Sequence, residues 1–333
     1  MADMQTRPSG TGVLLGVAAA LAAAAVANHY AARRLERRNP PRGRFVEAEG
    51  VRLHYLEKGR GDGPPVVLLH GNLVTADDFA ASGLLDRIAG RHRTVAFDRP
   101  GYGHSDRPRG TAWTPAAQAG LLRAAFDRLG LDRPVVLGHS WGAMVALALA
   151  LDHPEAVRGL VLLGGYFYPT MRADAALALP PAVPLLGGLI RHTVGPPLGA
   201  ALLPAFVKGM FAPRPVPENF TEEVPLGLAL RPRQIRAMTE DGALMIPAAA
   251  AMQDRYPELA MPVAILAGAE DKVADVGRQS ERLHREVPHS TLRLVPGVGH
   301  MVHHAVPMEV AAAVESVAAG GRRVPEARLA QGA

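Results

Sequence analysis

The sequence has 333 residues, of which 48% are hydrophobic and 20% are charged, a composition typical of globular proteins and not of disordered chains. It contains no cysteine, which excludes disulfides, thiolate metal sites and a cysteine nucleophile. The net charge of +5 lies wholly in residues 1–44, where seven arginines face Asp3 and Glu36. The remaining chain has no basic excess, so we do not expect it to bind nucleic acid.

The chain opens with an apolar segment, residues 13–27, that carries no polar side chain and is followed by six arginines between Arg33 and Arg44. This segment is mostly alanine and shorter than the roughly 20 residues of a full span. Because a basic cluster beside an apolar segment stays on the cytoplasmic side, we predict that residues 13–27 anchor the protein in a membrane, with its body in the cytoplasm. The alternatives are an export signal, cleaved near Ala25-Val26-Ala27, and a helix without a membrane role.

The body begins after a linker at Asn39-Pro40-Pro41. Residues 45–57 alternate between apolar and polar around Glu49-Gly50, which predicts a hairpin. Short, almost wholly apolar segments then predict strands buried on both faces, at Val66–Leu69, Thr94–Phe97, Val135–Leu137, Leu160–Leu163, Val263–Leu266 and Leu292–Val295. Helical patterns lie among them, at Ala116–Leu129, Ala143–Leu151, Val276–Glu286 and Met308–Ala318. This alternation predicts an α/β fold with a mostly parallel central sheet and crossover helices.

The alternation stops between Tyr166 and Leu259, where the chain is rich in proline, alanine and leucine and shows no clear strand. We therefore predict a helical insertion at residues 166–259, over the loop end of a core formed by residues 45–165 and 260–319. Residues 1–44 form the apolar segment and a basic linker, and the polar tail, residues 320–333, is predicted to be disordered.

The strongest motif is G-H-S-W-G at residues 138–142, directly after a predicted strand and before a predicted helix. G-x-S-x-G forms a sharp strand-to-helix turn in which the glycines let the backbone close under the serine. The serine hydroxyl is then held at the carboxyl end of the strand, where the first N–H groups of the helix favour negative charge. Ser140 is the predicted nucleophile, in an elbow that Gly138, His139 and Gly142 form.

A serine hydroxyl is a poor nucleophile until a base takes its proton. His300 lies in a glycine-lined loop after the strand predicted at 292–295, at the same edge of the sheet as Ser140. We predict that His300 is this base. His303 and His304 lie close by in the sequence, but no carboxylate or cysteine accompanies them there, so no metal site is expected.

The histidine needs an acid to fix its tautomer and to stabilise the imidazolium. Asp271 follows the strand predicted at 263–266 and is the predicted partner, with Glu270 and Asp275 as alternatives. The order Ser, Asp, His along the chain is the one that this strand-turn-helix architecture uses.

Two backbone donors must hold the oxyanion of the reaction. His70-Gly71-Asn72 follows the strand at 66–69 and offers a turn that can face the nucleophile. We assign the donors to the N–H groups of Trp141 and Asn72, with Leu73 as the alternative to Asn72.

With these residues identified, the chain resembles the α/β-hydrolase superfamily over roughly residues 45–319, in its capped, serine-nucleophile branch of esterases and haloperoxidases. The matching segments are HGN at 70–72, DRPGYGHS at 98–105, GHSWG at 138–142, GAEDKV at 268–273 and GVGH at 297–300. The resemblance implies the α/β-hydrolase fold, with a helical cap inserted after the sixth strand. It also implies a positioning role, at most, for Arg99, Tyr102 and His104.

Related enzymes differ in their nucleophile and in the oxyanion turn. Haloalkane dehalogenases share HGN and a tryptophan after the nucleophile, but they and epoxide hydrolases use an aspartate where this chain has Ser140. Prolyl aminopeptidases typically carry HGGPG, from which Asn72-Leu73 departs. We therefore predict hydrolysis of a small to medium apolar carboxylic ester, with no metal or organic cofactor. A haloperoxidase or perhydrolase, a carbon–carbon bond hydrolase and a non-enzymatic binding module remain alternatives.

The predicted cap carries many large apolar side chains that could line an apolar pocket. Leu73, Tyr166 and Phe167 are the predicted pocket residues at its entrance. Further candidates are Leu185, Leu186, Leu189, Ile190, Leu202, Leu203, Phe206, Met210 and Phe211. The alternative is that these side chains pack the helices of the cap against one another.

Overall fold

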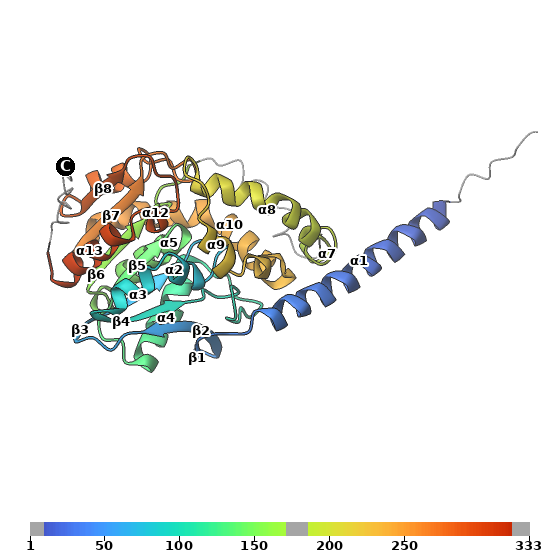
Figure 1. Ribbon diagram of the computed structural model, residues 1–333, viewed down its shortest axis with the longest axis horizontal. Coiled ribbons are helices and arrows are strands. Elements are labelled where there is room, and N and C mark those ends of the chain that lie inside the picture. The colour runs from blue at the N-terminus through green and yellow to red at the C-terminus, as the bar shows by residue number, and fades with distance from the viewer. Residues whose placement is uncertain (1–9, 171–185, 322–333) are drawn as a thin grey trace, which may run out of the picture.

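An eight-stranded sheet forms the centre of the molecule in the computed structural model, which describes residues 10–170 and 186–321 (Figure 1). The strands are β1 Arg44–Ala48, β2 Val51–Lys58, β3 Gly63–Leu69, β4 His92–Phe97, β5 Val135–His139, β6 Gly159–Leu163, β7 Val263–Gly268 and β8 Thr291–Val295. Their order across the sheet is β1-β2-β4-β3-β5-β6-β7-β8. β2 runs antiparallel to both β1 and β4, and the other neighbours are parallel, so the predicted mostly parallel sheet is confirmed.

Helices cover both faces of this sheet. Those of the core are α2 Asp77–Ala81, α3 Leu84–Ala89, α4 Pro115–Leu129, α5 Trp141–Asp152, η1 Pro154–Ala156, α11 Ser280–Glu286, α12 Val302–Ala305 and α13 Pro307–Ala318. The clusters of buried side chains place α4, α5 and α11 over one face, and α3 and α13 over the other. The fold is therefore the three-layered α/β arrangement that the alternation of strands and helices predicts.

The uninterrupted apolar runs follow from this burial on both faces. In β3, Val67 and Leu69 pack into the cluster under α4 and α5, whereas Val66 and Leu68 pack into the cluster under α3 and α13. Successive side chains of a strand point to opposite faces, so both sets must be apolar when helices cover both faces. The same reasoning explains β5, in which all five residues are buried.

Local signals account for several turns and helix ends. Glu49 and Gly50 both have positive φ, 47° and 71°, as the tight hairpin between β1 and β2 requires. Thr114 caps α4 by accepting a hydrogen bond from the N–H of Ala117, and Gly130 ends the helix in the left-handed conformation. The helix predicted over 276–286 is shorter, because α11 begins at Ser280. The short helices α2 and α3 were not predicted from the sequence.

The described part of the segment between β6 and β7 that follows residue 185 is helical, as predicted. It contains α7 Leu186–His192, α8 Gly195–Phe211, α9 Glu218–Glu223, η2 Leu226–Leu230, α10 Pro232–Met252 and η3 Gln253–Glu258. We call these elements the cap. Part of the predicted cap, residues 171–185, lies outside the described residues, as do residues 1–9 and most of the predicted tail, 322–333.

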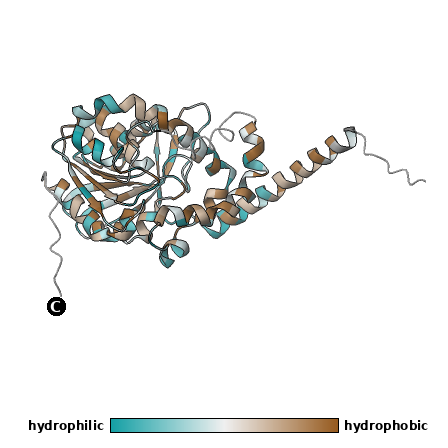
Figure 2. Ribbon diagram, turned by 90° about the horizontal axis from the view of Figure 1, so that it is seen from above, coloured by the Kyte–Doolittle hydropathy of each residue, from teal (hydrophilic) through white to brown (hydrophobic). Residues whose placement is uncertain are grey.

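The helix α1, Gly10–Arg38, projects from the body on the side of the cap, and its projecting part is coloured mostly in hydrophobic shades (Figure 2). Among the described residues, one helix is by itself long and apolar enough to cross a membrane. It is the part of α1 over Leu14–Arg38. Membrane anchors and signal sequences near an N-terminus share this feature.

Candidate active site

Ser140 lies on a strained turn between β5 and α5. Its backbone has φ 53° and ψ −118°, a conformation that non-glycine residues rarely adopt. Close packing under the serine explains the two glycines of the motif. A Cβ on Gly138 would lie 2.4 Å from the carbonyl oxygen of Gly142, and a Cβ on Gly142 would lie 2.1 Å from that of Leu69. The sequence thus builds the predicted elbow and presents Ser140 at the carboxyl edge of the sheet.

His300 and Asp271 form a buried pair after β8 and β7. His300 Nδ1 lies 2.8 Å from Asp271 Oδ2, and the other carboxylate oxygen accepts hydrogen bonds from the N–H groups of Val273 and Ala274. With Nδ1–H donated to the carboxylate, Nε2 of His300 is left as the basic nitrogen. Asp271 thus occupies the position in which an acid orients a histidine.

The alternative acids have other partners. Glu270 accepts a hydrogen bond from the N–H of Val298, and Asp275 accepts one from the N–H of Arg278. Neither contact involves His300, so the geometry favours Asp271 over both.

His139 holds the loop of His300 against the elbow. Its Nε2 lies 3.2 Å from the carbonyl oxygen of His300, and the two rings lie 4.8 Å apart. Burial lowers the pKa of His139 well below its usual value, so the ring is neutral and donates through Nε2. The residue before the nucleophile therefore fixes the backbone of the predicted base.

The predicted oxyanion turn packs directly against the nucleophile. A Cβ on Gly71 would lie 3.0 Å from Ser140 Cβ and 3.1 Å from His139 Nδ1, so a larger residue would have to displace these neighbours by a few tenths of an ångström. Asn72 is the next residue in the chain, and Leu73 after it has a positive φ of 75°. The turn from β3 thus reaches the start of α5, where the N–H of Trp141 lies.

A buried arginine holds this turn in place. Arg99 Nε donates to the carbonyl oxygen of His70 at 2.8 Å, and its Nη2 donates to Asn72 Oδ1 at 2.9 Å. The hydroxyl of Tyr102 also lies 2.7 Å from Asn72 Oδ1. Both side chains contact Asp241 of α10, Arg99 at 2.7 Å and Tyr102 at 3.0 Å. The D-R-P-G-Y segment therefore links the oxyanion turn to the cap.

His104 lies in the same loop but makes a different contact. Its backbone N–H donates to Asp98 Oδ2 at 2.9 Å, and its ring packs edge-on against that of His54. Asp98 also accepts from His54 and from the N–H of Ala76, so the three contacts fix the loop to the sheet.

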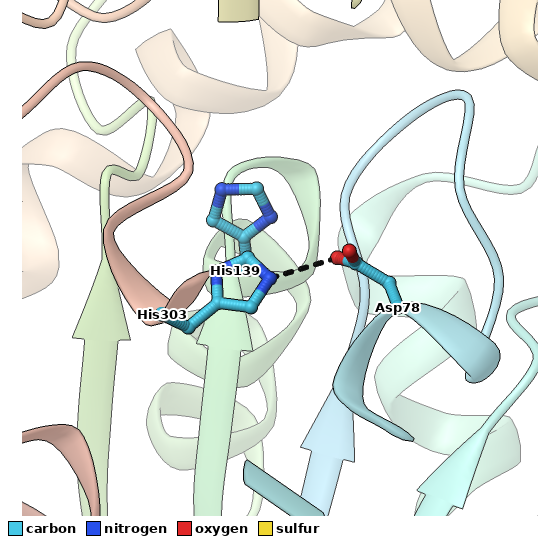
Figure 3. A group of neighbouring side chains, drawn as sticks. All are labelled: Asp78, His139 and His303. Atoms are coloured by element: carbon cyan, nitrogen blue, oxygen red, sulfur yellow. Dashed lines mark hydrogen bonds and ion pairs between the residues drawn. The ribbon is translucent and has the colours of Figure 1, made fainter. Parts of the chain in front are cut away.

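A second cluster of polar side chains lies behind the elbow (Figure 3). Asp78 of α2 accepts from His303 Nε2 at 2.9 Å and from His304 Nε2 at 2.7 Å. The expectation that no carboxylate accompanies these histidines was wrong, because Asp78 is distant in sequence but adjacent in space. Burial by itself raises the pKa of Asp78, but His303 and His304 outweigh it and hold that pKa well below its usual range.

Asp78, His139 and His303 each bring one potential ligand atom within 4.8 Å of the others, a spacing that a metal ion could use. Both oxygens of Asp78 and Nε2 of His303 already form hydrogen bonds, whereas Nδ1 of His139 and Nδ1 of His303 are buried without a hydrogen-bond partner among the described residues. A metal bound to Asp78 would compete with these bonds. The cluster therefore fixes α12, directly after His300, to α2.

The predicted pocket residues are all buried. Leu73 packs with Met210 and Phe211 of the cap, whereas Tyr166 and Phe167 belong to the main cluster under α4 and α5. Four of the large apolar side chains of α7 and α8 are about half exposed and are therefore not packed inside the cap: Leu186, Leu189, Leu202 and Phe206. Leu185 lies outside the described residues.

A surface hollow of about 840 Å³ lies at another place, beside β2. Its lining includes Arg42, Arg44, Lys58 and Arg60, and it contains none of the predicted triad. This hollow therefore has no part in the candidate site.

Residues 64–305 match the family model of the α/β-hydrolase fold. Haloalkane dehalogenase 2 from Mycobacterium tuberculosis is 27% identical over 285 residues, which cover 83% of this chain and 94% of that protein. Among solved structures, Cfl2 from Burkholderia cenocepacia has a TM-score of 0.67 and 25% identity, covering 80% of this chain and 92% of that one. Est816, described as an N-acyl homoserine lactone degrading enzyme, has a TM-score of 0.62 and 25% identity, covering 80% and 96%.

Proposed function

The chain belongs to the α/β-hydrolase family, and on that premise we propose that it is a serine hydrolase that cleaves carboxylic esters with an apolar acyl or alcohol part. The observation that carries this proposal is the strained backbone of Ser140, with φ 53°, at the same edge of the sheet as a His300–Asp271 pair at 2.8 Å. Strain of this kind costs about 1–3 kcal/mol and persists where function requires it. A serine that only capped the start of a helix would not need this strained backbone.

In the proposed mechanism, Ser140 attacks the ester carbonyl while Nε2 of His300 takes its proton. The N–H groups of Trp141 and Asn72 hold the oxyanion, and the alcohol leaves with the proton from His300. Water, activated by His300, then attacks the acyl-serine and releases the acid. Asp271 stays ionised throughout and stabilises the imidazolium. None of these steps requires a metal or an organic cofactor.

The dehalogenase reaction of the Mycobacterium tuberculosis relative does not transfer to this chain. Haloalkane dehalogenases use an aspartate, whose alkyl ester can be hydrolysed by attack at its carbonyl, whereas Ser140 would form an ether that has no carbonyl. Est816 supports the ester assignment, because a lactone is a cyclic ester. Perhydrolysis and carbon–carbon bond cleavage use the same triad and are the enzymatic alternatives, and a binding module is the non-enzymatic one.

The test is labelling of the detergent-solubilised full chain with a fluorophosphonate, which reacts only with an activated serine. We expect labelling of the natural chain, none of Ser140→Ala, and a large loss in His300→Ala. Two matched controls, Ser82→Ala between α2 and α3 and His153→Ala at the far end of α5, should label normally. Well-folded protein that is not labelled would refute the serine-hydrolase assignment and favour the binding module.

We also propose that α1 anchors the protein in a membrane with the body on the cytoplasmic side. The support is the apolar stretch of α1 followed by the arginines in its last turns, which resist translocation. Since the chain has no cysteine, Asp132→Cys gives a single thiol on the body. A membrane-impermeant maleimide should leave this thiol unlabelled in intact cells and label it after lysis. Labelling in intact cells would instead favour export.

A further inference from the structure

The cap exposes large apolar side chains on two consecutive helices. Six of them are each 48–58% exposed: Leu186, Leu189, Val194, Leu198, Leu202 and Phe206. Single exposed apolar side chains are common on soluble proteins, but a contiguous group of this kind marks an interaction surface. We call these six residues the cap patch.

The cap patch follows the geometry of α8. Val194, Leu198, Leu202 and Phe206 are spaced by four residues, so they lie along one side of the helix. The opposite side of α8 is also apolar, because Val207, Met210 and Phe211 are buried against the body. A helix that is apolar on both sides normally has apolar partners on both. On its outer side, this one has no such partner among the described residues.

The N-terminal helix lies beside the cap patch. Asn28 Nδ2 donates to the carbonyl oxygens of His192 at 2.9 Å and Thr193 at 2.6 Å, at the end of α7. The apolar part of α1 that precedes Asn28 projects away from the body on this side (Figures 1 and 2). Eighteen helical residues extend about 27 Å, close to the roughly 30 Å thickness of the hydrocarbon layer. A bilayer that contains this part of α1 would therefore meet the end of α7.

Basic residues near the end of α7 also support a bilayer at this place. Arg191 and His192 lie in the last turn of α7, and Arg33, Arg34, Arg37 and Arg38 follow Asn28 on α1. Basic side chains at the edge of an apolar surface are the pattern by which helices bind at the headgroup level of anionic membranes. On the outer side of α8, by contrast, Lys208 is the first charged residue.

We propose that the cap patch lies in the surface of a lipid bilayer, beside the membrane-inserted α1. The cap of the body then faces the lipid, and the carboxyl edge of the sheet, with Ser140, lies beneath it. This placement has one consequence that rests on the proposed ester hydrolysis: esters dissolved in the membrane would reach the cap without crossing water. The docking of the cap patch itself does not depend on catalysis.

The test uses single cysteines in the full chain, which has none of its own. Leu202→Cys on the cap patch and Asp132→Cys carry a polarity-sensitive fluorophore. Asp132 is exposed and precedes β5, so it lies at the opposite edge of the sheet. Both proteins are reconstituted into vesicles of phosphatidylethanolamine and phosphatidylglycerol, with and without a quencher attached to the acyl chains.

We expect the label at position 202 to shift to the blue and to lose more than half of its emission to the lipid quencher, while the label at 132 is unaffected. If the protein floats with the vesicles but neither label is quenched, the cap patch does not dock although α1 is anchored. If the label at 202 shifts without being quenched, a second copy of the chain covers the cap patch instead. Protein that does not float at all refutes both the anchor and the docking.

A second measurement separates docking from catalysis. The double variant Leu198→Glu/Leu202→Glu should lose several-fold in hydrolysis of a vesicle-embedded ester and keep its rate on a soluble short-chain ester. Met308→Glu is the matched control, because Met308 is a large exposed apolar residue of α13, away from the cap. An equal loss on both esters would refute the docking. If no ester is hydrolysed by any form, the proposed function fails, and lipid quenching still decides the docking.

Discussion

Removal of one hydroxyl tests whether the oxyanion turn is held from the cap. The Tyr102 hydroxyl lies 2.7 Å from Asn72 Oδ1 and 3.0 Å from Asp241 Oδ2, and the side chain is fully buried. In Tyr102→Phe both acceptors keep a donor, because Arg99 contacts each of them. No buried acceptor is left unsatisfied, so we expect a loss of about 1–2 kcal/mol in the free energy of unfolding. For a chain of this size, that lowers Tm by roughly 1–3 °C.

The kinetic effect should appear in kcat. Loss of an oxyanion donor typically costs 10²–10³-fold in kcat, and here the N–H of Asn72 would be displaced but not removed. We therefore expect kcat to fall roughly 3- to 30-fold on a soluble short-chain ester, with KM little changed. The assay is steady-state hydrolysis of that ester, together with thermal unfolding of the same preparation.

Tyr168→Phe is the matched control for this variant. Its hydroxyl donates to Glu286 Oε2 at 2.7 Å, away from the oxyanion turn, and its ring is also buried. This control should lower Tm and leave kcat unchanged. If Tyr102→Phe lowers Tm but keeps the kcat of the natural chain, the hydroxyl contributes only to stability, and Asn72 is not positioned through it.

Three further predictions concern the same site. Asp271→Asn should lower kcat by roughly 10³–10⁴-fold without unfolding the chain, because His300 would lose the acceptor for its Nδ1–H; a loss of less than tenfold would exclude Asp271 as the orienting acid. Gly71→Ala should slow fluorophosphonate labelling several-fold, because the new Cβ would lie 3.0 Å from Ser140 Cβ and displace it by a few tenths of an ångström; normal labelling would show that the turn does not pack as described. Burial lowers the pKa of His70 to about 4, so between pH 6.5 and 4 the unfolded chain binds the proton that the folded chain does not. His70 should therefore make the free energy of unfolding fall by about 1.4 kcal/mol per pH unit as the pH drops through this range, and urea melts of His70→Gln should show a shallower fall.

The sheet and the positions of the three candidate catalytic residues were predictable because short-range patterns encode them. A strand buried on both faces needs consecutive apolar residues, and β3, β5 and β6 show them without interruption. Ser140 and Asp271 each follow such a strand, whereas the expectation that β8 is buried on both faces was wrong, because this edge strand before His300 is only partly buried. Parallel strands bring all three carboxyl ends to one edge. Adjacency in the fold thus follows from local sequence at these positions.

Contacts made over long sequence separations were not predictable in this way. Asp78 and His303 are 225 residues apart, and Arg99 and Asp241 are 142 residues apart. Asp241 lies in the interior of α10, where no motif distinguishes it from a solvated carboxylate. A partner for each buried charge could be expected on energetic grounds, but its identity depends on how the cap packs.

The exposure of the apolar stripe on α8 was not predictable for a different reason. A stripe at a spacing of four residues marks one side of a helix, but the pattern is the same whether that side faces a core, a pocket or lipid. Because residues 207, 210 and 211 form the buried side, the stripe that contains Leu202 and Phe206 had to face outward. Composition predicted an apolar helix, and only the three-dimensional arrangement showed which side the body covers.

The start of α10 contacts α1, and its interior contacts the arginine that supports the proposed oxyanion turn. At its start, Arg231 contacts Glu36 of α1 at 3.2 Å and donates to the carbonyl oxygen of Gly103 at 2.6 Å. Ten residues further on, Asp241 binds Arg99, which holds the oxyanion turn. One helix therefore contacts the proposed membrane helix and the support of the proposed oxyanion site. Since packed elements of this kind move as units, a membrane that fixes α1 and the cap would also restrict the position of α10. Because α1 is anchored whether or not the cap patch docks, kcat on a soluble ester would then change on reconstitution in vesicles to the same extent in the natural chain and in Leu198→Glu/Leu202→Glu, with KM little changed.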